Sequence, residues 1–164
     1  MLDKMGNNSS SLFNARQGTY IIGIVMLLSS ATSLYIAKTF SRRFLFVYGH
    51  IAIGIAHISV GLFAYLNQPF LALFSMCMFI IFYQNSSGCI TWLYFSEIAV
   101  DVIIGLVGFF GYLIVFILSV ITPFILDKNN LGPTNTFIIF GIISFLAAIW
   151  TYLYIKETMG LNDK

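Results

Sequence analysis

The positions of the charged residues constrain this chain more than any other feature of its sequence. Only 9% of the 164 residues are charged, and long apolar stretches without Asp, Glu, Lys or Arg lie between them. A helix needs about 20 mainly apolar residues to cross the hydrocarbon core of a bilayer. Such stretches recur along the chain at residues 18–37, 44–66, 70–96, 102–126 and 134–155. The sequence therefore predicts an all-α integral membrane protein with five transmembrane helices.

Polar segments divide the chain into three parts. Residues 1–17 form a polar N-terminal segment, residues 18–155 form the five-helix region, and residues 156–164 form a polar tail. Lysine and arginine are enriched in the cytoplasmic loops of membrane proteins. The turn after the first span, the turn after the third span and the tail share one side and hold more of these residues than the other side. We therefore expect that turn and the C-terminus to be cytoplasmic.

The composition excludes several other classes of protein. A soluble domain carries about 45–50% apolar and about 25% charged residues, whereas 59% of this chain is hydrophobic. The net charge of +2 is too small for a surface that follows nucleic-acid phosphates. Both cysteines, Cys77 and Cys89, lie in apolar runs and are interpreted as small core residues. No metal-ligand spacing, phosphate-binding loop or catalytic triad is visible, so we predict neither a cofactor nor an enzyme.

The third span contains an unusually polar centre. Residues 83–92 run from a tyrosine through Gln-Asn-Ser-Ser-Gly to Thr91 and Trp92, and Glu97 follows near the end of the span. A polar, glycine-containing patch weakens a helix locally and faces protein or water rather than lipid. One interpretation is a solute site, since irregular helices form such sites in transporters. The alternative is a patch that packs against neighbouring helices. Glu97 is expected to pair with Arg42 or Arg43 near the membrane surface.

The second span carries two histidines and two glycines on one helical stripe. His50, Gly54, His57 and Gly61 are spaced by four, three and four residues, which places them on one face. The first interpretation is a small-residue face on which helices approach closely and the imidazoles bond to neighbours. The second is a proton relay, although the span contains no carboxylate.

Three segments, taken in order, match motifs of one transporter family. Residues 38–43 read Lys-Thr-Phe-Ser-Arg-Arg, residues 84–97 run from a glutamine through Thr-Trp to Ser-Glu, and residues 156–160 read Lys-Glu-Thr-Met-Gly. They resemble the turn before helix 9, helix 10 and the end of helix 12 in the sugar porter family of the major facilitator superfamily. The resemblance covers about residues 12–161 and implies that the five spans correspond to helices 8–12 of such a transporter.

The resemblance also implies roles for individual residues. The tryptophan of the family's helix 10 lines the sugar site and matches Trp92, and a polar sugar-contacting residue eight positions earlier matches Gln84. Tyr112 stands where the family has a tryptophan in helix 11. The family's cytoplasmic salt bridges, which must break for inward opening, match Arg42, Arg43, Glu97 and Glu157. Lys38 stands where that cluster carries an acidic residue.

Members of this family bind substrate between two six-helix halves and rock those halves for alternating access. The resemblance implies a sugar as substrate, of the hexose type, and the lipid bilayer as surroundings. Because residues 1–164 match only the last five helices, we expect that the chain is incomplete and not transport-competent alone. Its expected partner is the missing N-terminal half or a related transporter chain. The alternative is a non-transporting membrane protein that associates with a partner membrane protein.

Overall fold

Five helical spans make up the computed structural model, which describes residues 15–127 and 130–158. Four spans are single helices: α2 (Ala15–Thr39), α3 (Arg42–Tyr65), α6 (Asp101–Ile125) and α7 (Gly132–Tyr154). The third span joins α4 (Pro69–Tyr83), the π-helix η2 (Gln84–Gly88) and α5 (Cys89–Ile98). Each span is long and apolar enough to cross a membrane. The predicted all-α protein with five transmembrane helices is thereby confirmed.

The helices begin slightly before the predicted spans, whereas α3, α6 and α7 end one residue earlier than predicted. α2 includes Arg16 and Lys38, and α3 begins at Arg42 rather than after the basic turn. Long basic side chains keep their stems along a helix while their charges reach the interface. The charged residues therefore do not mark where the helices end. The greater part of the expected N-terminal segment, residues 1–14, and residues 159–164 of the expected tail lie outside the described residues.

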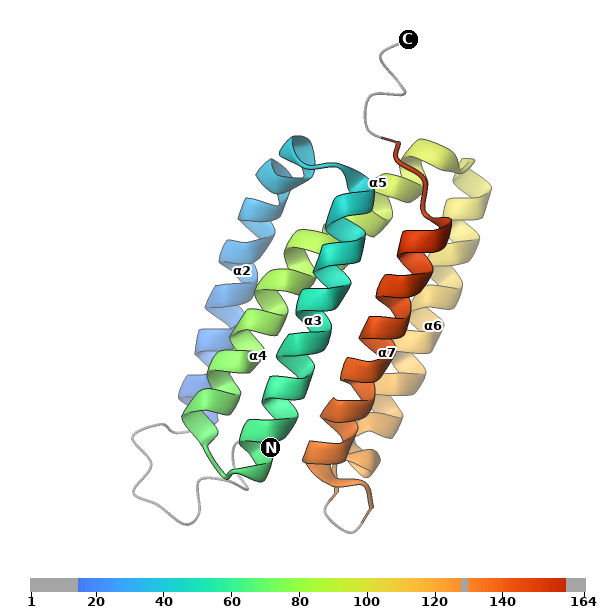
Figure 1. The fold of residues 1–164 in the computed structure, drawn as a ribbon. Coiled ribbons are helices and arrows are strands. Elements are labelled where there is room, and N and C mark those ends of the chain that lie inside the picture. The colour runs from blue at the N-terminus through green and yellow to red at the C-terminus, as the bar shows by residue number, and fades with distance from the viewer. Residues whose placement is uncertain (1–14, 128–129, 159–164) are drawn as a thin grey trace.

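α3 lies at the centre of the bundle (Figure 1). It packs against α7 on one side and against α4 on the other, while α2 packs against α4 and η2. α6 lies at the edge beside α7 and contributes no buried residue (Figure 1). The α2–α3 turn, the α5–α6 turn and the end of α7 meet at one end of the bundle. This end holds the charged cluster described below.

Glycines set the spacing between α3 and its neighbours. A Cβ atom added at Gly54 would lie 3.2 Å from the carbonyl oxygen of Gly141 in α7, and one at Gly61 would lie 3.0 Å from the carbonyl oxygen of Thr134. His57 on the same stripe lies against the rings of Phe79 and Phe137. Its Nδ1 is 3.1 Å from the backbone carbonyl of Ile53. These contacts support the packing interpretation of the stripe rather than the proton relay.

The closest approach joins α3 to the π-helix. A Cβ atom added at Gly49 would lie 2.2 Å from the Cβ of Ser86. Ser86 is almost completely buried, and so is Ile90 one turn later. No side chain larger than hydrogen fits at Gly49 without moving one of the two helices. Gly49 therefore lets the polar segment of the third span rest directly on α3.

We predict that Gly49→Ala destabilises the bundle by about 1–3 kcal/mol, since inserting a methyl group into a tight contact forces a backbone shift. Gly105→Ala is the matched control, because a Cβ atom there meets nothing within 4 Å and alanine favours the helix. Thermal unfolding of the purified chain in detergent, followed by circular dichroism, measures both. Equal melting temperatures for the two variants would contradict the close approach.

Candidate functional site

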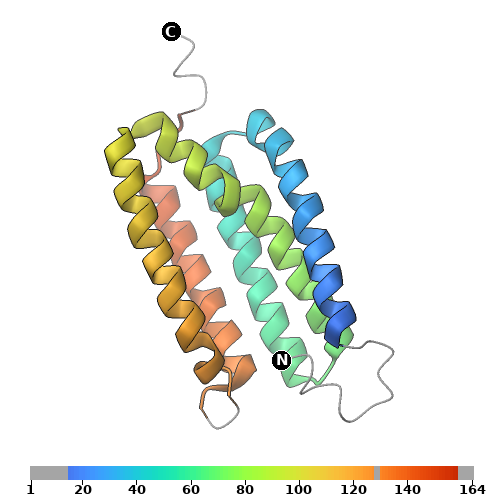
Figure 2. The ribbon, with the colours of Figure 1, turned by 180° about the vertical axis from the view of Figure 1, so that it is seen from behind.

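The polar centre of the third span forms a π-helix rather than a break. Asn85 Nδ2 donates to the carbonyl of Ile81 at 2.8 Å, and Ser86 Oγ donates to that of Phe82 at 2.6 Å. Such side-chain bonds compete with the regular backbone pattern of an α-helix, and π-helical turns inside α-helices are frequent at functional sites. The third span runs across the bundle, from beside α2 at one end to α6 at the other (Figure 2).

Trp92 of α5 and Tyr112 of α6 stack on each other beyond the π-helix. Their ring centroids are 6.1 Å apart and their planes differ by 24°. Gly108 makes room for the indole, since a Cβ atom there would lie 3.4 Å from it. The two rings line a groove of about 330 Å³ between α5 and α6, which we call the Trp92 groove. Its other lining residues include the hydroxyl-bearing Ser87 and Thr91.

Gln84 lies one helical turn before Gly88, a residue that lines the Trp92 groove. Its side chain is half-buried beside Gly88, where an added Cβ atom would lie 2.8 Å from the Gln84 Oε1, and Gln84 does not line the Trp92 groove. Its neighbour Asn85 accepts a hydrogen bond from Thr32 of α2 at 3.2 Å. The structure thus brings Trp92 and Tyr112 together, whereas the amide of Asn85 bonds to α2 and that of Gln84 lies beside Gly88 of the groove. Thr32 carries no motif by which the sequence could have indicated it.

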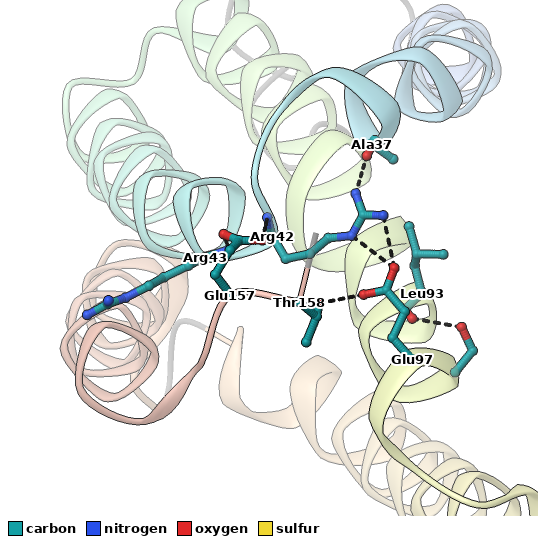
Figure 3. Close-up of polar contacts among 8 residues, drawn as sticks. Ala37, Arg42, Arg43, Leu93, Glu97, Glu157 and Thr158 are labelled. Atoms are coloured by element: carbon teal, nitrogen blue, oxygen red, sulfur yellow. Dashed lines mark hydrogen bonds and ion pairs between the residues drawn. The ribbon is translucent and has the colours of Figure 1, made fainter. Parts of the chain in front are cut away.

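An ion pair joins α3 to α5 at the charged end of the bundle (Figure 3). Arg42 Nη2 lies 3.0 Å from Glu97 Oε1, and both side chains are largely buried. Arg42 also donates to the backbone carbonyl of Ala37 in α2. Thr158, after α7, donates its hydroxyl to the second oxygen of Glu97. These residues, together with Glu157, form the Arg42 cluster, which connects α2, α3, α5 and the segment after α7.

Glu157 caps the first turn of α3. Its Oε1 accepts the backbone N–H of Arg42 at 3.0 Å, and its Oε2 accepts that of Arg43 at 3.1 Å. Ser41 completes the cap by accepting the N–H of Phe44 at 3.4 Å. The first N–H groups of a helix have no partner within the helix, and the helix dipole favours a negative charge there. Glu157 therefore ties the segment after α7 to the start of α3.

Arg43 points away from the Arg42 cluster (Figure 3). Its Nη2 donates to the backbone carbonyl of Tyr152 in α7 at 2.8 Å, and its guanidinium lies 5.0 Å from the centroid of the Tyr152 ring. The four predicted salt-bridge residues thus have three different roles in the structure. Arg42 and Glu97 form the ion pair, Glu157 caps α3, and Arg43 contacts Tyr152. Sequence reasoning missed the contributions of Ser41 and Thr158. A serine directly before an apolar helix is a recognisable cap signal, and Thr158 lies inside the motif of residues 156–160.

Comparison with known proteins shows which family the chain belongs to. A model of the family described as "Sugar (and other) transporter" matches residues 2–162. The chain belongs to this family. It is a family of transporters rather than of enzymes, and this membership confirms the resemblance found in the sequence motifs. Together with the five spans, it makes the chain an integral, multi-pass membrane protein.

Several members of the Sugar (and other) transporter family are similar to the chain over most of its length. Hexose transporter 1 of Plasmodium falciparum is 22% identical over 94% of the chain, which covers 33% of that protein. The D-xylose-proton symporter of Escherichia coli K12 is 26% identical over 87% of the chain and 31% of that protein. A partially occluded inward open structure of the E. coli xylose transporter XylE matches with a TM-score of 0.76 at 25% identity. That match covers 87% of the chain and 33% of the solved chain. The chain therefore spans about a third of the length of these relatives.

The Arg42–Glu97 pair gives a direct test of the cluster. We predict that Glu97→Gln lowers the free energy of unfolding by about 3 kcal/mol, because it leaves a largely buried guanidinium without its counter-charge. Asp101→Asn serves as the control. Asp101 is an exposed acidic residue in the first turn of α6, and its loss should cost less than about 1 kcal/mol. Denaturant titration in detergent measures both, and equal losses would contradict the importance of the pair.

Proposed function

We propose that this chain contributes to the transmembrane transport of a hexose-type sugar and that the Trp92 groove forms one wall of the sugar path. The observation that carries the proposal is the stacked pair of Trp92 and Tyr112 beside the π-helix. Membership of the Sugar (and other) transporter family supports it. A ligand site needs a mainly apolar lining with a few polar groups that fix orientation, and Ser87 and Thr91 supply hydroxyls to this groove.

The chemistry of the lining suits a neutral, hydroxyl-rich ring. None of the described residues that line the groove is charged, so the groove offers no counter-charge to an ionic substrate. The exposed part of the Trp92 indole presents an apolar surface on which the C–H face of a sugar can lie. Hydroxyl groups such as those of Ser87 and Thr91 both donate and accept hydrogen bonds. We place Gln84 deeper in the same path, where its amide would contact a sugar that has moved past Trp92.

The groove is open, and we propose that helices outside residues 1–164 complete it. The chain spans about a third of the length of its curated relatives, and transporters of this kind bind substrate between repeated halves. In this proposal the partner is an N-terminal half or a related transporter chain, and the chain alone carries no sugar flux. The Arg42 cluster is then a cytoplasmic gate, since it holds four separate segments together at one end of the bundle.

A second candidate function is association with a partner membrane protein without transport. The feature that favours it is α6, which contributes no buried residue although many of its large apolar side chains are exposed. Both proposals place another protein against this helix. They differ in whether the sugar binds. Co-purification with a membrane protein, together with no stereoselective sugar binding by the complex, would favour the second.

The sequence contains two tryptophans, Trp92 and Trp150, and they provide a matched pair for testing the site. Trp150 lies on α7, is exposed and packs at a tilt against the ring of Tyr154. We predict that Trp92→Ala weakens binding of D-glucose by about tenfold or more, because the sugar loses its aromatic surface. Trp150→Ala should leave binding unchanged. Isothermal titration of the purified chain in micelles, with L-glucose as the inert control, measures the affinities.

Two outcomes would contradict the proposal in different ways. If Trp92→Ala and the unaltered chain bind the sugar with equal affinity, the sugar does not bind in the Trp92 groove. Saturable, stereoselective uptake of D-glucose by the chain alone in liposomes would show that no further helices are needed. The first result concerns the site, and the second concerns the need for a partner.

A further inference from the structure

A second groove lies between α3 and α7, away from the Trp92 groove. It has a volume of about 360 Å³. Its apolar wall includes Val47 and Ile51 of α3, and its polar rim includes Arg43, Tyr152 and Glu157. The Trp92 groove is lined by residues of α4, η2, α5 and α6, so the two grooves share no helix. We call the second one the Arg43 groove.

The guanidinium of Arg43 is held in place at the rim. The Tyr152 carbonyl accepts one of its N–H groups, and the Tyr152 ring lies beneath its positive charge. A guanidinium has five N–H donors, so this arrangement leaves several of them for another acceptor. Among the described residues, the ion pair joins Glu97 to Arg42 and not to Arg43. Arg43 is thus an exposed, oriented cation at the mouth of an apolar groove.

The acidic residue at the rim is already engaged by the backbone. Both oxygens of Glu157 accept N–H groups at the start of α3, at 3.0 and 3.1 Å, and the helix dipole compensates part of its charge. The neighbouring Lys156 is exposed and adds a second positive charge at this end of the bundle. With the carboxylate of Glu157 held by backbone N–H groups, the Arg43 guanidinium is the rim group available to an anion, and a planar guanidinium binds phosphate oxygens well.

The depth of the groove matches the boundary between headgroups and hydrocarbon. α3 begins at Arg42 and α7 ends at Tyr154, so Arg43 and Tyr152 lie at the end of the membrane-spanning region. Tyrosine is enriched at this level of membrane proteins. Ile51 lies eight residues further along α3, which is about 12 Å deeper at 1.5 Å per residue. The groove is therefore cationic at the interface and apolar towards the bilayer centre.

We propose that the Arg43 groove binds one anionic phospholipid. Its phosphate contacts the guanidinium of Arg43, and one acyl chain lies along Val47 and Ile51. The occupant is a lipid rather than a free phosphate, because most of the groove is apolar and its α3 lining continues from Arg43 through Val47 to Ile51. This site is independent of the sugar path, since neither Trp92 nor the π-helix takes part in it.

Native mass spectrometry of the full chain in micelles tests the proposal. The chain is exposed to equal amounts of phosphatidylglycerol and phosphatidylcholine with the same acyl chains. We expect retention of phosphatidylglycerol to exceed that of phosphatidylcholine by about fivefold, the effect of one basic residue near an anionic surface. Arg43→Gln should abolish this preference. Arg16→Gln, which removes the same charge from an exposed site at the start of α2, should keep it.

A second variant tests the acyl-chain half of the groove without changing any charge. Ile51→Trp fills the apolar part and should reduce retention of both lipids, whereas inorganic phosphate should displace neither lipid from the unaltered chain. If Arg43→Gln loses its helical circular dichroism signal, lipid retention by Ile51→Trp is the test, and unchanged retention would contradict the proposal. Equal retention of the two lipids by the unaltered chain would overturn the proposal. So would an equal loss of the phosphatidylglycerol preference in Arg43→Gln and Arg16→Gln. Chain dimers that disappear in Ile51→Trp while lipid retention stays the same would assign the groove to a second copy instead.

Discussion

Backbone hydrogen bonding inside the bilayer is the constraint on which the rest of this structure depends. The hydrocarbon core contains no water to satisfy a free N–H or C=O group, so every span has to satisfy its own backbone. The third span shows the limit of this rule, because its polar centre stays helical by widening into the π-helix Gln84–Gly88. In that segment, the Asn85 amide and the Ser86 hydroxyl donate hydrogen bonds to backbone carbonyls one turn earlier. A polar patch thereby becomes tolerable at membrane depth.

The same rule explains why the ends of the spans carry the charged interactions. Arg42 and Glu97 are largely buried where the helices end and the backbone regains access to polar partners. Glu157 satisfies two N–H groups that α3 itself cannot satisfy. As a result, the segment after α7 is joined to α3 and, through Thr158, to α5. In the proposed transporter this connection has to break whenever that end of the bundle opens.

Neighbouring residues of one motif have separate tasks in the folded chain. Arg42 turns inward to Glu97, while Arg43, the next residue, lies over Tyr152 on α7 (Figure 3). Successive residues of a helix point about 100° apart, so a pair of arginines at a helix start serves two surfaces. The same holds for the third span, where Trp92 faces α6 and Asn85 faces α2. The proposed wall of the sugar path and the proposed lipid site can therefore use different faces of one small bundle.

The sequence alone determined the membrane class, the number of spans and the family, because charge-free length and ordered motifs are properties of the chain itself. It also indicated Trp92, Tyr112, Arg42 and Glu97 as residues of interest. Tertiary structure alone decided how they are arranged: Trp92 stacks on Tyr112, Arg42 pairs with Glu97, and Arg43 bonds to Tyr152 instead. These choices depend on where close contacts such as Gly49 on Ser86 set the rotation and tilt of each helix. The sequence pattern shows which residues share one face of a helix, whereas packing decides which neighbouring helix that face contacts.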